Sequence, residues 1–225
     1  MNPDELTPIL EVLRQGVPIV LLDDPKREGE ADLIFHAKHM TSENVRLMRK
    51  EAGGLICLAS DEEQARKLGV PFAADLMRES KHPTLKHMAL ERSPYGDPSA
   101  FSIWINHRQT FTGITDDDRS LTIRKFEEMI KADGPGMASV FARDFYSPGH
   151  VPLLIGRGLL HRKGHTELTL ALARKAGLPS AMCLCEMLGD NGKAMPWNQV
   201  RSRAQERGWI VVEGPELIKA LQGGK

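Results

Sequence analysis

The sequence contains few cysteines and few aromatic residues, and it lacks a long apolar run. Only 3 cysteines occur in 225 residues, and aromatic residues make up 5% of the chain. Because the cysteines are sparse and odd in number, the sequence predicts no disulfide framework and suits a reducing, cytoplasmic compartment. No stretch approaches the ~18 apolar residues of a membrane helix, and the first residues lack the basic start and apolar stretch of a signal peptide. We therefore expect no membrane partner.

An excess of charge of either sign is also absent. The 30 basic residues balance the 30 acidic ones, so no overall field favours nucleic acid as a partner. Cys183 and Cys185 form a C-x-C pair with no second Cys or His pair nearby, a spacing that does not favour a zinc site. The chain lacks the nucleotide P-loop, the dinucleotide-binding glycine fingerprint and the hydrolase nucleophile elbow. The common nucleotide-binding and hydrolase functions are thereby excluded.

Short apolar runs and amphipathic segments alternate along the chain. Apolar patterns predict strands over residues 18–22, 33–35, 55–58, 101–105, 151–154, 181–187 and 209–212. Helical periodicity and capping residues predict helices over 2–16, 41–49, 61–69, 122–131, 166–176, 196–207 and 215–222. Residues 78–97 are polar and show little periodicity, which predicts a long loop. Because no linker interrupts the pattern, we expect one α/β or α+β domain over residues 1–225.

A charged loop follows the first predicted strand. Its residues 27–32 read Arg-Glu-Gly-Glu-Ala-Asp and place three carboxylates close together. Ligands usually bind at strand ends in α/β proteins, and clustered carboxylates repel one another unless a cation or a polar ligand lies between them. Oxygen ligands of this kind suit Mg²⁺ or Mn²⁺. Taken alone, the pattern is more often a solvated acidic turn.

A second candidate site stands at the start of the helix predicted over 166–176. Residues 162–167 read Arg-Lys-Gly-His-Thr-Glu. Free N–H groups at a helix N-terminus bind phosphate, Gly164 lets a ligand approach, and Thr166 adds a hydroxyl. Arg162 can add a planar set of donors, and His165 suits metal ligation or proton transfer. The alternative is a well-capped helix with a surface histidine.

Three further side chains stand at turns or strand ends. His150 follows a Pro-Gly turn that would hold its side chain at a fixed angle, although a histidine in a turn is more often ordinary surface. Glu186 ends an apolar strand, where burial would suit it to acid/base catalysis; otherwise it is simply the exposed end of the strand. Thr112 lies in a polar stretch, residues 110–119, that is either a helix cap or a pocket wall lined by hydroxyls.

Together these motifs resemble those of the 3,4-dihydroxy-2-butanone 4-phosphate synthase family. Segments 27–32, 112–119, 147–151, 164–167 and 185–187 occur in the order found in that family, and the similarity extends from about Gly16 to Val212. The Arg-Glu-Gly-Glu form of the acidic loop and the Thr-Gly-Ile-Thr-Asp-Asp-Asp-Arg stretch are most similar to archaeal members. Spaced motifs in a fixed order are far more specific than any one of them, so the ordinary interpretations lose most of their weight.

The resemblance implies both a function and a fold. Members of the family convert ribulose 5-phosphate, a phosphorylated sugar, into 3,4-dihydroxy-2-butanone 4-phosphate and formate in riboflavin biosynthesis. The implied fold is a mixed β-sheet flanked by helices, and the implied assembly is a homodimer with active sites shared between the subunits. Many relatives carry a fused GTP cyclohydrolase II half. This chain lacks the cysteine cluster of that half, so only the first activity is implied.

The resemblance also implies a role for each site residue. Glu28 and His165 would hold Mg²⁺ or Mn²⁺. The substrate would be bound by Arg27, Asp32, Thr112, Arg162, Gly164, Thr166 and Glu186. The catalytic positions would be Glu30, Asp32, Cys57, His150 and Glu186, with His150 acting from the partner subunit.

Two rival functions are compatible with much of this pattern. The first is another metal-dependent phosphosugar isomerase or aldolase, which would share the enolisation step but would not release formate. The second is a catalytically silent relative that binds a phosphosugar as a regulator. The expected acid/base positions are all filled, which weighs against a silent relative.

Overall fold

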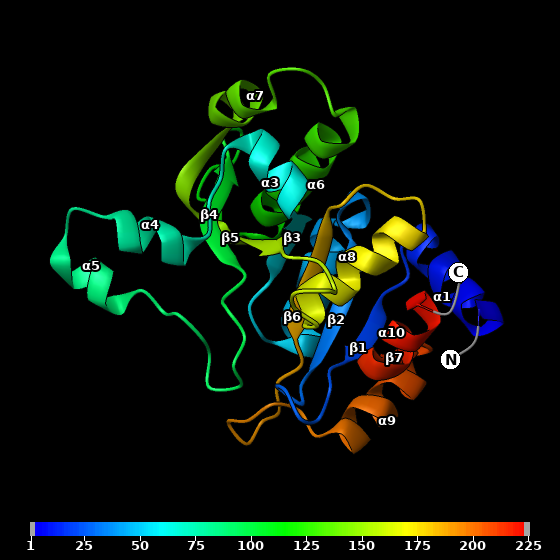
Figure 1. Cartoon of the computed structure of the whole chain (residues 1–225). Coiled ribbons are helices and arrows are strands. Elements are labelled where there is room, and N and C mark those ends of the chain that lie inside the picture. The colour runs from blue at the N-terminus through cyan, green and yellow to red at the C-terminus, as the bar shows by residue number, and fades with distance from the viewer. Residues whose placement is uncertain (1–2, 223–225) are drawn as a thin grey trace.

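The strands form one mixed sheet of seven strands in the computed structural model, which describes residues 3–222 (Figure 1). The strand order is β4 (Phe101–His107), β5 (Phe145–Gly156), β3 (Cys57–Asp61), β6 (Met182–Glu186), β2 (Ala31–His36), β1 (Ile19–Leu22) and β7 (Ile210–Glu213). β1 is parallel to β7 and β3 is parallel to β5, whereas the other neighbours are antiparallel. The mixed sheet implied by the sequence is confirmed.

Helices cover both faces of this sheet (Figure 1). They are α1 (Pro3–Gln15), α2 (Ser42–Leu47), α3 (Glu62–Leu68), α4 (Ala73–Glu79), α5 (Pro83–Met88), α6 (Asp116–Ala132), α7 (Met137–Asp144), α8 (His165–Lys175), α9 (Trp197–Arg207) and α10 (Gly214–Gln222), with a 3₁₀ turn at Ala37–His39 and a π turn at Met48–Ala52. α1, α8 and α10 contribute to one buried apolar cluster, and α2, α6, α7 and α9 contribute to the other. Each face of the sheet therefore has its own core.

Alternation along the strands decides which side chains reach the site. Ile34 packs in the cluster that contains α8, whereas its neighbour Leu33 packs in the other cluster. Asp32 is two residues from Ile34 and therefore points to the α8 side. Asp32 lies opposite Glu186 in the β2–β6 register, and Cys57 lies on this side of β3. Period-two geometry thus gathers ionisable groups from three strands on one face.

Most predicted elements are present at nearly the predicted bounds. Thr41, Asp61 and Thr115 cap α2, α3 and α6 by accepting hydrogen bonds from backbone N–H groups of the first turn. α6 begins at Asp116 rather than at the predicted residue 122, and its three N-terminal aspartates lie at the positive end of the helix dipole. Asn2, at the predicted start of the first helix, lies outside the described residues. No helix within residues 3–222 is long and apolar enough to cross a membrane.

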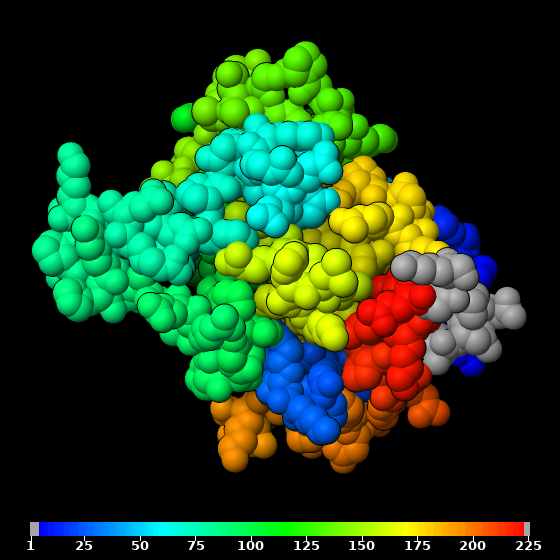
Figure 2. Space-filling model, in the orientation of Figure 1, coloured from blue at the N-terminus to red at the C-terminus, as the bar shows by residue number. Residues whose placement is uncertain are grey.

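Three predictions of local structure were wrong or incomplete. The loop predicted over 78–97 contains the end of α4 and all of α5, short helices without buried residues that form an arm standing away from the body (Figure 2). Because neither helix has a buried face, neither shows the apolar periodicity from which a helix is predicted. α7 was missed as well. The predicted Pro-Gly turn at 148–149 is a bulge within the long strand β5, opposite the step between Ile105 and Asn106.

Candidate active site

A cavity of about 280 Å³ lies on the α8 side of the sheet and collects most of the predicted site residues. Acidic-loop residues, strand ends, the start of α8 and the segment before β4 all contribute to it. The lining residues are Glu28, Glu30, Asp32, Cys57, Leu90, Ser93, Tyr95, Ser99, Ala100, Phe101, Leu154, Arg162, His165, Thr166, Leu184 and Glu186. Segments far apart in the sequence thus meet in one pocket.

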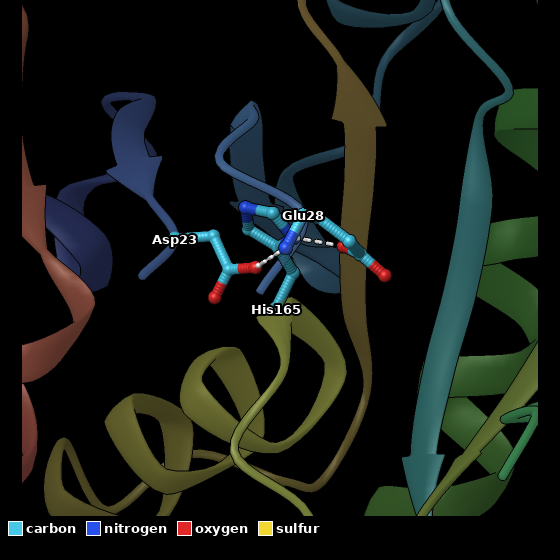
Figure 3. A group of neighbouring side chains, drawn as sticks. All are labelled: Asp23, Glu28 and His165. Carbon is cyan, nitrogen blue, oxygen red and sulfur yellow. Dashed lines mark hydrogen bonds and ion pairs between the residues drawn. The ribbon is translucent and has the colours of Figure 1, made fainter. Parts of the chain in front are cut away.

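Three potential ligands for a metal ion converge beside this cavity. Asp23 at the end of β1, Glu28 in the acidic loop and His165 at the start of α8 place ligand atoms within 4.8 Å of one another (Figure 3). His165 Nδ1 lies 3.3 Å from a Glu28 carboxylate oxygen, and His165 Nε2 lies 3.7 Å from Asp32 Oδ1. His165 Nε2, Asp32 Oδ1 and Asp23 Oδ1 are buried and have no hydrogen-bond partner. Unpartnered buried oxygen and nitrogen atoms of this kind fit a hard divalent cation.

The electrostatics of the group fit a cation as well. Burial alone would lower the pKa of His165, but the carboxylates of Asp32, Glu28 and Asp23 raise it to about 9. Burial alone would raise the pKa of Glu28, but bonding to His165 and Tyr95 and the charge of Arg27 lower it to about 2. The protein therefore surrounds Glu28 with positive charge, and a metal ion would replace the proton of His165.

Asp32 and Glu186 face each other across β2 and β6 on the wall of the cavity. Burial and the nearby carboxylates of Glu186 and Glu28 raise the pKa of Asp32 to about 7, against the opposing effect of His165. Burial and the charges of Glu28 and Glu186 also raise the pKa of Glu30. A carboxyl group with a pKa near neutrality can both accept and donate a proton, as general acid/base catalysis requires.

Cys57 also lines the cavity, and burial together with the carboxylates of Glu186 and Asp32 raises the pKa of its thiol well above the usual value. The thiol is therefore protonated and is not an activated nucleophile. All three cysteines are free and buried.

A candidate anion-binding corner adjoins the candidate metal group. Arg27 Nη2 and Arg162 Nε are buried and have no hydrogen-bond partner. A Cβ atom on Gly164 would lie 2.6 Å from both Arg27 Nη2 and Arg162 Nη1, so only glycine lets the two guanidinium groups reach the start of α8. Gly164 caps α8 without a side-chain hydrogen bond, which leaves first-turn N–H groups free. Glu167 holds Arg162 in place through a 2.6 Å ion pair.

Sequence analysis missed three residues of this region. Asp23 Oδ2 accepts hydrogen bonds from Arg27 Nη1 at 2.8 Å and from the Glu28 backbone N–H at 3.2 Å, and its position at the end of β1 was a usable signal. Asp97 accepts a 2.6 Å hydrogen bond from Arg27 Nε, and Tyr95 lies under the Arg27 guanidinium at 4.8 Å. Nothing in the local sequence of residues 90–99, which we call the strap, predicted these contacts. The strap lies against the acidic loop in Figure 2.

Four predicted site residues do not line the cavity, and of these Arg27 and Gly164 lie in the adjoining corner. Thr112 and His150 belong instead to an outer platform, which we define as Asn106, Thr112, Gly113, Tyr146 and His150. Thr112 Oγ1 lies 3.3 Å from Asp118 Oδ2, and the Asn106 amide contacts both His150 and Tyr146. Thr112 and His150 are exposed to solvent.

A single glycine makes the platform possible. A Cβ atom on Gly149 would lie 2.0 Å from the backbone carbon of Ile105, so only glycine allows the β5 bulge to lie flat against β4. The bulge directs the next residue, His150, to the amide of Asn106.

Comparisons with known proteins agree with this geometry. The family model for 3,4-dihydroxy-2-butanone 4-phosphate synthase matches residues 7–220. A 3,4-dihydroxy-2-butanone 4-phosphate synthase of Methanosarcina mazei is 45% identical over 94% of this chain and 88% of the relative, and one of Archaeoglobus fulgidus is 41% identical over 93% and 91%. A crystal structure of such a synthase in complex with two magnesium ions superposes with a TM-score of 0.76 at 26% identity, covering 97% of each chain.

Proposed function

Because the chain belongs to the 3,4-dihydroxy-2-butanone 4-phosphate synthase family, which converts ribulose 5-phosphate to 3,4-dihydroxy-2-butanone 4-phosphate in riboflavin biosynthesis, we propose that the cavity beside Glu28 and His165 is where this chain carries out that reaction. The observation that carries the assignment is one pocket lined by four carboxylates, by Arg162 and by His165, whose buried Nε2 has no hydrogen-bond partner. We propose that residues 1–225 act as one such lyase domain.

Divalent metal binding is assigned to Asp23, Glu28 and His165, with Mg²⁺ or Mn²⁺ as the ion. The support is the convergence of their ligand atoms and the unpartnered buried atoms beside them. A bound divalent cation would stabilise negative charge that develops on the carbonyl oxygen of the sugar. Arg27 and Tyr95 hold Glu28 in place for this role.

Phosphate binding is assigned to Arg162, Gly164 and Thr166, with Arg27 beside them. The support is the free N–H groups at the start of α8 and the two unpartnered guanidinium nitrogens. This corner fixes one end of the substrate, so the carbon atoms of the sugar extend toward Asp32 and Glu186. Binding energy from the phosphate thereby orients the reacting carbons.

Proton transfer is assigned to the carboxyl groups of the cavity. Enolisation needs a base for a C–H proton next to the carbonyl, and the later skeletal rearrangement and loss of formate need further proton transfers. Asp32, with a pKa of about 7, and Glu186, opposite it, suit these steps. Glu30 adds a third carboxyl group at the wall, and the protonated Cys57 thiol adds a weak donor.

A homodimer supplies the rest of the site. Thr112 and His150 have catalytic or substrate-binding positions in the family resemblance, yet neither lines the cavity of its own chain. Large apolar side chains near Thr112 are exposed to solvent. Phe111 is 95% exposed and Ile114 is 50% exposed. Exposed apolar groups next to polar functional groups are typical of an interface. We therefore propose that the platform of one copy enters the cavity of the other.

The compartment follows from the cysteines. All three are free and buried, a state that a reducing compartment maintains. We propose that the enzyme is cytoplasmic and that its partners are the phosphosugar and a second copy of the chain.

The test is to incubate the purified protein with ribulose 5-phosphate and Mg²⁺, with and without EDTA, and to assay formate. Formate and a four-carbon phosphorylated ketone in one-to-one yield, abolished by EDTA, are expected. Consumption of substrate without formate would identify an isomerase or aldolase instead. Ligand-induced stabilisation without turnover would identify a phosphosugar-binding relative.

A further inference from the structure

The Asn106 amide makes three hydrogen bonds that together fix the orientation of His150. Asn106 Oδ1 accepts a 2.8 Å hydrogen bond from the backbone N–H of His150. Asn106 Nδ2 lies 3.1 Å from His150 Nδ1 and 2.9 Å from the Tyr146 hydroxyl oxygen. Asn106 is 1% exposed, whereas His150 is exposed. A buried amide thus holds an imidazole ring that faces solvent.

The hydrogen-bond partners of this amide determine which of its two terminal atoms is the oxygen and which is the nitrogen. A backbone N–H group can only donate, so the atom of Asn106 that faces the His150 N–H must be the carbonyl oxygen. The other atom is then the NH₂ group, whose two hydrogens have two acceptors, Tyr146 Oη and His150 Nδ1. All donors and acceptors of the amide are satisfied in this arrangement and in no other.

The amide in turn determines the tautomer of His150. An NH₂ group donates to Nδ1 only if Nδ1 carries a lone pair and no proton. In the neutral imidazole the proton must therefore be on Nε2. Nε2 lies on the side of the ring away from Nδ1, and its N–H is available to a ligand outside the chain.

We infer that Asn106 is a positioning residue that keeps His150 as a neutral Nε2–H donor, so that His150 donates a hydrogen bond to an oxygen of the sugar and does not act as a base. This inference rests on the proposed function, in which His150 reaches the substrate in the cavity of a second copy. It extends that function by assigning His150 the role of a hydrogen-bond donor. The carboxyl groups of the cavity are left as the bases.

Gly113 gives independent support for a fixed amide. A Cβ atom on Gly113 would lie 1.9 Å from Asn106 Nδ2, so the backbone of the Thr112 loop lies directly on the amide. The Gly113 N–H in turn donates a 2.8 Å hydrogen bond to Asp118, which holds the loop. Close packing against the Gly113 backbone therefore adds to the hydrogen bonds that hold the amide in place.

The direct test is ¹⁵N nuclear magnetic resonance of the histidine side chains in the wild-type protein, with His150 assigned from the spectrum of His150→Gln. At a pH where His150 is neutral, we expect Nδ1 to resonate as an unprotonated nitrogen and Nε2 as a protonated one. A protonated Nδ1 would overturn the inference. This readout does not depend on turnover, so it stands apart from the formate assay that tests the proposed function.

The variant Asn106→Asp sharpens the test. A carboxylate can only accept, so it requires a proton on Nδ1, and the ¹⁵N pattern of His150 should reverse. Formate production should show kcat lowered at least about tenfold with KM changed less than about threefold, as for loss of a hydrogen-bond donor in the transition state. A reversed tautomer with unchanged kcat would contradict the donor role.

A matched control removes the tyrosine hydroxyl that accepts the other hydrogen bond of the Asn106 NH₂ group. Tyr146→Phe removes one partner of Asn106 Nδ2 but leaves both bonds to His150. The Nε2-protonated tautomer should persist in this variant. If Tyr146→Phe reversed the tautomer as Asn106→Asp does, general loosening of the platform would explain both results and the specific role of Asn106 would be wrong.

Discussion

The cavity and the outer platform hold their functional side chains in different ways. In the cavity, ionisable groups are buried or half-buried and change one another's pKa values, as His165, Glu28 and Asp32 do. On the platform, Thr112 and His150 are exposed, and hydrogen bonds to Asp118 and Asn106 hold them. The cavity is rich in carboxylates and arginines, whereas the platform supplies a hydroxyl and an imidazole. Each region has what the other lacks.

Under the proposed function, the difference means that neither region is a complete active site. A metal and phosphate pocket can bind and polarise a sugar, but negative charge that develops on several oxygens needs a hydrogen-bond donor on another side of the substrate. An exposed histidine without a pocket has no substrate to act on within its own chain. The proposed homodimer with shared sites would resolve both deficits, and variants of the two regions should therefore fail in different ways.

The largest effect is expected in the cavity. His165→Ala should lower formate production at least about a thousandfold, because a metal contributes several kcal/mol to transition-state stabilisation. Binding of Mn²⁺, measured by electron paramagnetic resonance, should be lost in parallel. His161→Ala, which removes an exposed histidine four positions away, is the matched control and should retain both properties. Metal binding that survives in His165→Ala would refute the proposed metal group.

The platform should give a smaller and different defect. His150→Ala should lower kcat roughly a hundredfold, a usual effect of losing one hydrogen-bond donor to charge that develops in the transition state. Because His150 is outside the metal group, Mn²⁺ affinity should stay within about twofold of wild type. An equal loss of Mn²⁺ binding would show that the platform and the cavity are not separate units.

The pH dependence of metal binding should follow the ionisation of the cavity. His165, with its pKa raised to about 9, is protonated at pH 7 and must lose that proton to bind a metal. Asp32, with a pKa of about 7, loses its proton in the same direction. Mn²⁺ affinity should therefore rise with pH, up to about tenfold per pH unit, and level off above about pH 9. Titration calorimetry from pH 6.5 upward measures this, and a flat profile would contradict the coupling.

The strap should give the smallest effect, and one of opposite sign. Asp97 competes for Arg27 and lies 3.8 Å from Arg162 Nε, so its carboxylate repels a phosphate bound at the same corner. Asp97→Asn should tighten the binding of inorganic phosphate by about fivefold, as removal of one partly screened charge predicts. Glu91→Gln removes an exposed charge from the same strap and should leave the affinity unchanged. Weaker phosphate binding in Asp97→Asn would mean that Asp97 supports the corner.

Sequence patterns predicted the cavity better than its surroundings, for physical reasons. The acidic loop after β1 and the glycine before α8 are local signals, and strand alternation places Asp32 and Glu186 on one face. Asp97 could not be predicted, because it meets Arg27 across 70 positions through a segment without periodicity. Asn106 was not predicted either, because its contact with His150 depends on a bulge in β5 that the local sequence suggested only as a turn.

The most direct test of shared active sites mixes two defective variants. His165→Ala and His150→Ala proteins, each nearly inactive alone, are unfolded, combined in equal amounts, refolded together and assayed for formate from ribulose 5-phosphate. Random pairing makes about half of the dimers mixed. In each mixed dimer one site carries both defects and the other site is intact, so about a quarter of wild-type activity should return. A mixture as inactive as its parents would contradict the account, since each chain would then need its own His150 and His165.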